Sequence, residues 1–202
     1  MKNKERGISK MKVVEPIRDY SKIQAIKANL KRRCPRDYLL FVLGITSGLR
    51  ISDILKLKVE DVKNKDGSIR NILRFVEKKT KKPRRLPLSK NTKEALRYYF
   101  DKTGVFEYGQ YLFTSNKSNG NIPLTGVRAW QLVNDWCYAV GINHSVGTHT
   151  LRKTAGYMMR TRGNIPIEQI SEILGHSNLK VTSRYIGITD DEVEKNLRDF
   201  DL

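Results

Sequence analysis

The sequence predicts a mostly helical domain that carries a small antiparallel β-sheet. Three observations lead to this fold class. Apolar residues recur at helical spacing through most of the 202 residues, whereas residues 69–76 have the β-branched, apolar character of a strand. The chain is 39% hydrophobic, which is enough for a buried core. No Pro- or Gly-rich linker divides residues 15–188, so we expect one domain there.

The chain begins with a basic segment. Its first twelve residues hold five basic residues and one acidic residue and show no apolar periodicity, so residues 1–14 are expected to form a flexible basic lead. A helix is predicted from Ser21, which is a suitable N-cap. Its apolar residues fall at i, i+3 and i+7 and are Ile23, Ile26 and Leu30.

Two further helices are predicted next. Pro35 opens the first of them, because a missing N–H costs nothing in the first helical turn. Residues 38–45 are apolar enough to lie in the core, and Gly48 can end the helix in the left-handed conformation. Ser52 is placed to cap a short helix that follows.

A β-hairpin is expected in the middle of the chain. Asp66-Gly67 is a turn signal, and the strand predicted over residues 69–76 can pair with residues 85–88 after a basic turn. Ser89 then caps a helix that runs to about Lys102.

The second half of the domain is predicted to be helical. Helices are expected over residues 125–140 and 148–162, then from Pro166 to Leu174, and last from Ser177, which is placed as an N-cap.

The C-terminal segment has the opposite charge to the rest. Residues 186–202 hold six acidic and two basic residues, so this segment is not expected to seek a polyanion. Thr189 and Glu192 have the spacing of a capping box. An apolar stripe follows at helical spacing and consists of Val193, Leu197 and Phe200.

The net charge narrows the function classes. The formal charge of +18 indicates a polyanionic partner, which is DNA, RNA or an anionic membrane surface. No apolar run approaches the roughly 18 residues that a membrane span needs, so we expect a cytoplasmic protein without a membrane partner. Cys34 and Cys137 form no C-x-x-C pair and are expected to be buried hydrophobes, not metal ligands or a disulfide.

Several polar residues stand at spacings that suggest a common site. His149 and Arg152 share one face of a predicted helix, because they lie three residues apart. His176 falls at the junction of two helices, and Tyr185 lies nine residues beyond it. Arg50 directly follows a predicted helix end. Each of these residues alone is more often structural than functional, so only their combination favours a site.

The combined set resembles the catalytic domain of the tyrosine recombinases, the phage integrase family. The resemblance runs from about residue 15 to the C-terminus, and the order and spacing of all parts agree. Its extent is similar to that of the short fimbrial phase-variation invertases, although the chain is also consistent with a fragment of a longer recombinase. The matching parts are Gly-Leu-Arg50-Ile-Ser-Asp53, Lys79 in a turn, His149-x-x-Arg152, Leu-Gly-His176-Ser and Tyr185.

The resemblance implies a role for each residue of the set. Tyr185 would attack a DNA phosphodiester and form a 3′-phosphotyrosyl link. Arg50 and Arg152 would stabilise the transition state, because planar guanidinium groups give two hydrogen bonds to phosphate oxygens. His149 would accept the tyrosine proton, and His176 would bind a non-bridging oxygen. No metal, ATP or other cofactor is implied.

Further polar residues have supporting roles in this interpretation. Asp53 would orient Arg50 or its neighbours. Lys79 would protonate the leaving 5′-oxygen, although its neighbours Lys78, Lys81 and Lys82 leave this assignment open. The residues expected to contact DNA are Lys78, Lys81, Lys82, Arg84, Arg85 and Lys153, of which Lys153 replaces a histidine found in many relatives.

The partners expected are double-stranded DNA and further copies of this chain. By resemblance, recombination requires a tetrameric synapse, and residues 189–202 would dock on a neighbouring protomer or on their own domain. Accessory DNA-bending proteins remain open. Two other functions also remain open, namely a type IB topoisomerase-like nick-and-reseal enzyme and a DNA-binding regulator without catalysis.

Overall fold

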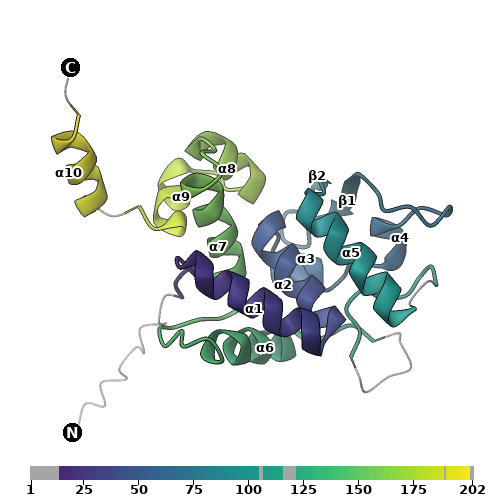
Figure 1. Ribbon diagram of the computed structural model, residues 1–202. Helices are drawn as coiled ribbons and strands as arrows, with labels where there is room; N and C mark the ends of the chain where they lie inside the picture. Colours follow the sequence, from purple (N-terminus) through teal and green to yellow (C-terminus); the bar gives the residue numbers. More distant parts are fainter. Residues whose placement is uncertain (1–13, 105–106, 116–121, 189, 201–202) are drawn as a thin grey trace, which may run out of the picture.

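The computed structural model describes residues 14–104, 107–115, 122–188 and 190–200. These residues form a helical body with one two-stranded sheet, so the predicted fold class is confirmed (Figure 1). In the first half, the elements are α1 (Tyr20–Arg33), α2 (Pro35–Ser47), α3 (Ile51–Ile54), α4 (Val59–Val62), β1 (Ile72–Val76), β2 (Pro83–Pro87) and α5 (Lys90–Thr103). In the second half, they are α6 (Gly126–Tyr138), α7 (Thr148–Thr161), α8 (Ile167–Leu174), α9 (Leu179–Ile186) and α10 (Asp190–Arg198).

Helix α2 is the centre of the core. It packs against α1, α5 and α7, so its residues 39–43 are buried whichever way they point, and this explains its apolar sequence. At Gly44, an added Cβ would lie 2.8 Å from the Cδ1 atom of Leu151 on α7. Glycine therefore lets α2 and α7 approach closely, and this contact places the next residue of α7, Arg152, beside the C-terminal end of α2.

The sheet is a hairpin whose two strands pair antiparallel, with Arg74 opposite Arg85. The first strand is shorter than predicted, since Ile69 forms only an isolated bridge with Lys63. The second strand starts two residues earlier than predicted, at Pro83. The basic turn between the strands is tight, and Lys81 in it adopts a φ of 59°.

Several predicted helix ends are confirmed and others are wrong. Ser89 caps α5 as predicted, and Thr125, the predicted first residue of the next helix, is the N-cap of α6. Gly48 ends α2 with a left-handed φ of 64°, also as predicted. However, Asp19 caps α1 in place of Ser21, and Asn178 caps α9 in place of Ser177. In both cases the competing side chain is equally suited to capping, so local sequence does not decide between neighbours.

Two short helices near the hairpin also differ from expectation. Helix α3 begins at Ile51, so Ser52 lies inside it and Arg50 occupies the N-cap position. Helix α4 (Val59–Val62) was not predicted, because four residues are too few to show a helical period.

The last three helices of the body form a small second cluster, in which Ile170, Leu174 and Ile186 are buried. Helix α10 lies apart from this body in Figure 1. Val193 and Leu197 on this helix are 56% and 74% exposed, and Phe200, two residues past its end, is 66% exposed. The capping box that involves Thr189 lies outside the described residues. Within the described ranges, no helix combines the length and the apolar character of a membrane span.

Candidate active site

Residues from three separate segments meet around the side chain of Tyr185. The tyrosine lies on α9, and its Oη atom is 3.2 Å from Nδ1 of His149 on α7. The ring of His176, which follows α8, meets the tyrosine ring edge-on at a centroid distance of 4.9 Å. The Arg152 guanidinium carbon lies 5.9 Å from the centre of the same ring. The structure thus places these four predicted residues in one cluster.

Arg152 is fixed by backbone carbonyl groups. It is only 4% exposed, and its Nη1 atom donates to the carbonyl oxygen of Gly48 at 2.7 Å. Its Nη2 atom donates to the carbonyl oxygen of Leu174. These acceptors are the ends of α2 and α8, where helical carbonyl groups lack an intrahelical partner. The arginine therefore joins three helices and is held in one orientation.

Arg50 enters the site at the N-cap of α3 and is held by an acidic residue that the sequence did not reveal. Its Nη1 atom lies 3.1 Å from Oε1 of Glu77, whose side chain is only 5% exposed. Glu77 follows the last residue of β1. In the sequence, Glu77 stands directly before eight residues of which six are basic, but this pattern does not identify its partner.

Asp53 has a contact that differs from the one expected. Its Oδ1 atom accepts a hydrogen bond from the backbone N–H of Lys78 at 3.0 Å, so it anchors the hairpin turn next to Lys79. The carboxylate is buried, and its Oδ2 atom has no hydrogen-bond partner among the described residues. Asp53 therefore holds the hairpin turn through the Lys78 backbone and makes this bond in place of one to the Arg50 guanidinium.

The residues predicted to contact DNA fall into two groups. Lys78, Lys81, Lys82 and Arg85 are exposed on the hairpin, as is Lys79, the predicted general acid. Two others make contacts inside the protein. Arg84 donates to the carbonyl oxygens of Glu172 and Ile173 on α8, at 3.2 and 2.8 Å. Lys153 is 8% exposed, and its Nζ atom lies 5.3 Å from the centre of the Tyr185 ring. Both therefore support the site from within.

The environment favours neutral histidines. Burial, with added repulsion from Arg152 and Arg50, lowers the pKa of His176 to about 4. The same causes, together with Lys153, lower the pKa of His149. At neutral pH His149 is thus an imidazole whose Nδ1 atom, when unprotonated, can accept a proton from the tyrosine hydroxyl. The Nδ1 atom of His176 lies 3.0 Å from the Thr182 hydroxyl.

Tyr185 itself needs such a base. Burial raises its pKa above the ordinary value of 10.0, although the nearby guanidinium groups of Arg152 and Arg50 oppose that rise. The phenol is therefore protonated at neutral pH and has to lose its proton as it attacks. His149 lies within hydrogen-bond reach for this purpose.

We expect the stability of the protein to fall in mild acid because of His176. In the unfolded chain this histidine binds a proton near its ordinary pKa of 6.5, whereas in the folded protein it does so only near 4. Between these values the unfolded state binds more protons, so stability is fully present above the upper value and decreases as pH falls. Urea unfolding at about pH 7 and about pH 5 measures this loss.

In the same measurement, His176→Gln should lose less stability than the wild type between the two pH values. His144→Gln, at an exposed position, serves as the matched control. An equal loss in wild type and His176→Gln would contradict the assignment.

Comparisons with known proteins show the family to which the chain belongs. Residues 18–192 match the profile of the family described as "Phage integrase family". The chain is 40% identical over 181 residues to "Probable integrase/recombinase YoeC" of Bacillus subtilis (strain 168), covering 90% of this chain and 93% of that protein. It is 33% identical to "Tyrosine recombinase XerA" of Pyrococcus horikoshii, covering 85% of this chain but 55% of that protein. The chain thus spans about half of the latter.

Solved structures have the same fold. The crystal structure of XerA recombinase superposes with a TM-score of 0.71 at 20% identity, covering 98% of this chain and 66% of that chain. XerH recombinase in a post-cleavage complex with its difH substrate also gives a TM-score of 0.71, at 19% identity, and covers 91% of this chain and 51% of the other. At these identities the likeness shows the fold alone.

Proposed function

The chain belongs to the phage integrase family of tyrosine recombinases, and from this membership we propose that it cuts and rejoins double-stranded DNA at specific sites through Tyr185. The observation that carries the proposal is the 3.2 Å contact between the Tyr185 hydroxyl and His149, beside the buried guanidinium of Arg152. A nucleophile, a base and an anion-binding group are thus within reach of one phosphate. The relatives named XerH and lambda integrase were solved on DNA.

The two arginines would bind the scissile phosphate. Negative charge grows on the non-bridging oxygens as phosphorus becomes pentacoordinate, and fixed guanidinium donors stabilise that charge. Arg152 is already oriented by two carbonyl groups, and Arg50 by Glu77, so little reorganisation is needed when DNA binds. His176 would add a hydrogen bond to the same phosphate through Nε2, since its Nδ1 atom contacts Thr182.

The proposed cleavage step transfers the phosphoryl group from the 5′-oxygen to Tyr185. The Tyr185 oxygen attacks phosphorus and transfers its proton to His149, while the bond from phosphorus to the 5′-oxygen breaks. The leaving oxygen takes a proton from Lys79 and becomes a 5′-hydroxyl group. The new 3′-phosphotyrosyl ester conserves the phosphodiester energy, so an incoming 5′-hydroxyl can reverse the steps without ATP. Because Tyr185 lies in the cluster of its own chain, the cut would be made in cis.

The role of Lys79 can be separated from those of its neighbours. We expect Lys79→Ala to slow cleavage of ordinary DNA by about 100-fold or more, because general acids contribute about 10²- to 10⁴-fold. A substrate with sulfur in place of the bridging 5′-oxygen has a leaving group that needs no proton, so it should be cleaved by Lys79→Ala almost as fast as by wild type. Single-turnover cleavage rates on both substrates provide the measurement.

The matched controls are Lys78→Ala, Lys81→Ala and Lys82→Ala. These changes should reduce DNA affinity and show no selective rescue by sulfur, because exposed lysines contribute mainly phosphate contacts. If one of them shows the rescue instead, that lysine is the general acid.

The exposed apolar residues of the C-terminal segment support a proposal for assembly. Val193, Leu197 and Phe200 are 56%, 74% and 66% exposed, and an apolar stripe of this kind is stabilised by burial. We propose that α10 docks on a neighbouring protomer, that residues 15–188 form the catalytic domain, and that assembly on DNA reaches a tetrameric synapse. Residues 1–14 would add DNA affinity as a basic lead.

Deletion of residues 190–202 tests the docking of α10. We expect the shortened protein to cleave a nicked substrate at nearly the wild-type rate but to lose higher-order complexes on DNA, because the deletion removes the stripe and leaves the site intact. Gel mobility at several protein concentrations reports the assembly. Unchanged assembly would mean that α10 packs on its own domain.

The function itself is tested with a nicked DNA suicide substrate in the presence of EDTA. A short strand lost on cleavage prevents religation, so a recombinase accumulates as a covalent protein–DNA adduct. Sites flanking the native gene supply the candidate sequences. No adduct on any of them would favour the DNA-binding regulator. An adduct with relaxation of supercoiled DNA, but without exchange between two sites, would favour the topoisomerase-like enzyme.

A further inference from the structure

A buried acidic residue, Glu77, connects separate parts of the site. Glu77 stands between β1 and the basic turn, and only 4% of the residue is exposed. A buried carboxylate is costly unless charged or polar partners compensate it. The contacts of this side chain therefore show what it holds in place.

The two carboxylate oxygens of Glu77 face different partners. Oε1 lies 3.1 Å from Nη1 of Arg50 and 3.7 Å from Nη1 of Arg84. Oε2 accepts a hydrogen bond from the Thr80 hydroxyl at 2.7 Å. The backbone of Glu77 also closes the turn, through hydrogen bonds with Lys81 and Lys82 at 2.9 and 3.0 Å. One residue thus joins Arg50 to the turn that contains Lys79.

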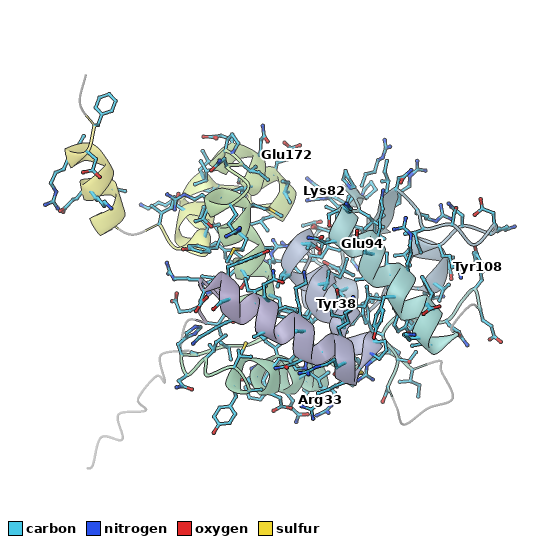
Figure 2. The ribbon with its side chains drawn as sticks, viewed as in Figure 1. Arg33, Tyr38, Lys82, Glu94, Tyr108 and Glu172 are labelled. Atoms are coloured by element: carbon cyan, nitrogen blue, oxygen red, sulfur yellow. The ribbon has the colours of Figure 1, made fainter. Side chains whose placement is uncertain are left out.

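The second arginine extends this link to His176. Arg84 binds the carbonyl groups of Glu172 and Ile173 at the end of α8, directly before Gly175 and His176. A Cβ at Gly175 would lie 2.6 Å from Nη1 of Arg84, so the turn before the histidine rests on this guanidinium. Lys82 and Glu172, both labelled in Figure 2, line one groove between the hairpin and α8.

The charge balance favours the ionised carboxylate. Burial opposes ionisation, but the hydrogen bond from Thr80 and the charges of Arg50, Arg84 and Arg152 hold the pKa of Glu77 below its ordinary value. The carboxylate takes up one Nη1 hydrogen of Arg50 and leaves the Nε and Nη2 donors for another anion. It therefore orients the guanidinium group without saturating it.

We propose that Glu77 is a positioning residue for strand cleavage, which holds Arg50 toward the scissile phosphate and fixes the Lys79 turn and the His176 loop relative to it. This inference rests on the proposed recombinase function. It assigns no contact between Glu77 and DNA, because like charges repel and the carboxylate is buried against protein groups. The expected effect of its loss is on the rate and not on binding.

Glu77→Gln is the sharpest test, because the amide keeps the size of the side chain and removes its charge. We expect the single-turnover rate of adduct formation to fall by about 10- to 100-fold, since small misplacements of catalytic groups have effects of this order. The Kd for DNA should stay equal or decrease, because one negative charge near the phosphate is gone. A Kd near the wild-type value also shows that the variant is folded.

Three further comparisons make the result specific. Glu172→Gln removes an exposed carboxylate that lines the same groove and whose backbone, rather than side chain, contacts Arg84, so it should leave the rate unchanged. In a double-mutant cycle, Glu77→Gln should have a smaller effect once Arg50 is Ala, because part of its action is exerted through Arg50. Glu77→Asp, which restores the charge on a shorter stem, should recover part of the rate.

The outcomes separate this inference from the proposed function. If wild type forms no covalent adduct, the recombinase function fails. If wild type reacts and Glu77→Gln reacts equally fast, or if rate and affinity fall by the same factor, the positioning role is overturned. Additive losses in the double-mutant cycle would likewise overturn the coupling to Arg50.

Discussion

Tyr185→Phe is expected to abolish covalent attachment to DNA. DNA affinity should stay within about twofold of wild type, because the substitution removes a single hydroxyl group and with it roughly one hydrogen bond. The phenylalanine ring fills the same space, so the edge-on contact with His176 and the contact with Arg152 are kept. Only the nucleophilic oxygen is lost. A denaturing gel of protein incubated with a labelled suicide substrate measures the adduct.

A tyrosine exposed to solvent on another helix provides the control. Tyr138 is 78% exposed on α6, so Tyr138→Phe should form the adduct at the wild-type rate. Persistence of the adduct in Tyr185→Phe would show that another side chain is the nucleophile. The tyrosine also lies 3.2 Å from a histidine of the same chain. We therefore expect each protomer to cleave DNA in cis, with its own tyrosine.

A mixture of variants tests this cis arrangement. Tyr185→Phe mixed with Arg50→Ala should not regain cleavage, because neither chain has a complete site of its own. Recovery of cleavage in the mixture would mean that the tyrosine is donated to a neighbouring protomer.

The sequence was most informative where function depends on spacing within one or two short elements. His149 and Arg152 lie on one helix. His176 lies shortly before α9 and Tyr185 lies on that helix, so the relative placement within each pair follows largely from helical geometry. Fold class followed from the same periodicity. These features need no knowledge of long-range packing.

The sequence was least informative where a side chain is satisfied by distant groups. The partners of Glu77 come from α3, the hairpin turn and β2, and no local pattern distinguishes it from a solvated surface acid. Arg84 had the appearance of a DNA contact because it stands in a basic run, whereas it binds carbonyl groups of α8. Burial of charged groups is a property of the tertiary structure, so sequence alone does not reveal it.

The two active-site arginines should give different phenotypes, and this difference is the second large effect we expect. Arg50→Ala should slow adduct formation by about 10²- to 10³-fold, the usual cost of removing one donor to a developing negative charge. It should leave DNA affinity nearly unchanged and cost less stability than Arg152→Ala, because the Glu77 carboxylate that loses Arg50 keeps Arg84 and the Thr80 hydroxyl as partners. Single-turnover rates and urea unfolding give both quantities.

Arg152→Ala should have the same kinetic effect and a structural one in addition. The guanidinium is buried and donates to the carbonyl groups of Gly48 and Leu174, so its removal leaves two acceptors at helix ends without their donor. Each unsatisfied buried group costs about 1–3 kcal/mol, so the free energy of unfolding should fall by about 2–6 kcal/mol. Arg152→Lys retains a charge but not the planar fork that spans both carbonyls, so it should recover only part of the stability. Equal stability of the two alanine variants would contradict the structural role of Arg152, because Arg152 donates to carbonyl groups at the ends of α2 and α8 whereas Arg50 contacts Glu77.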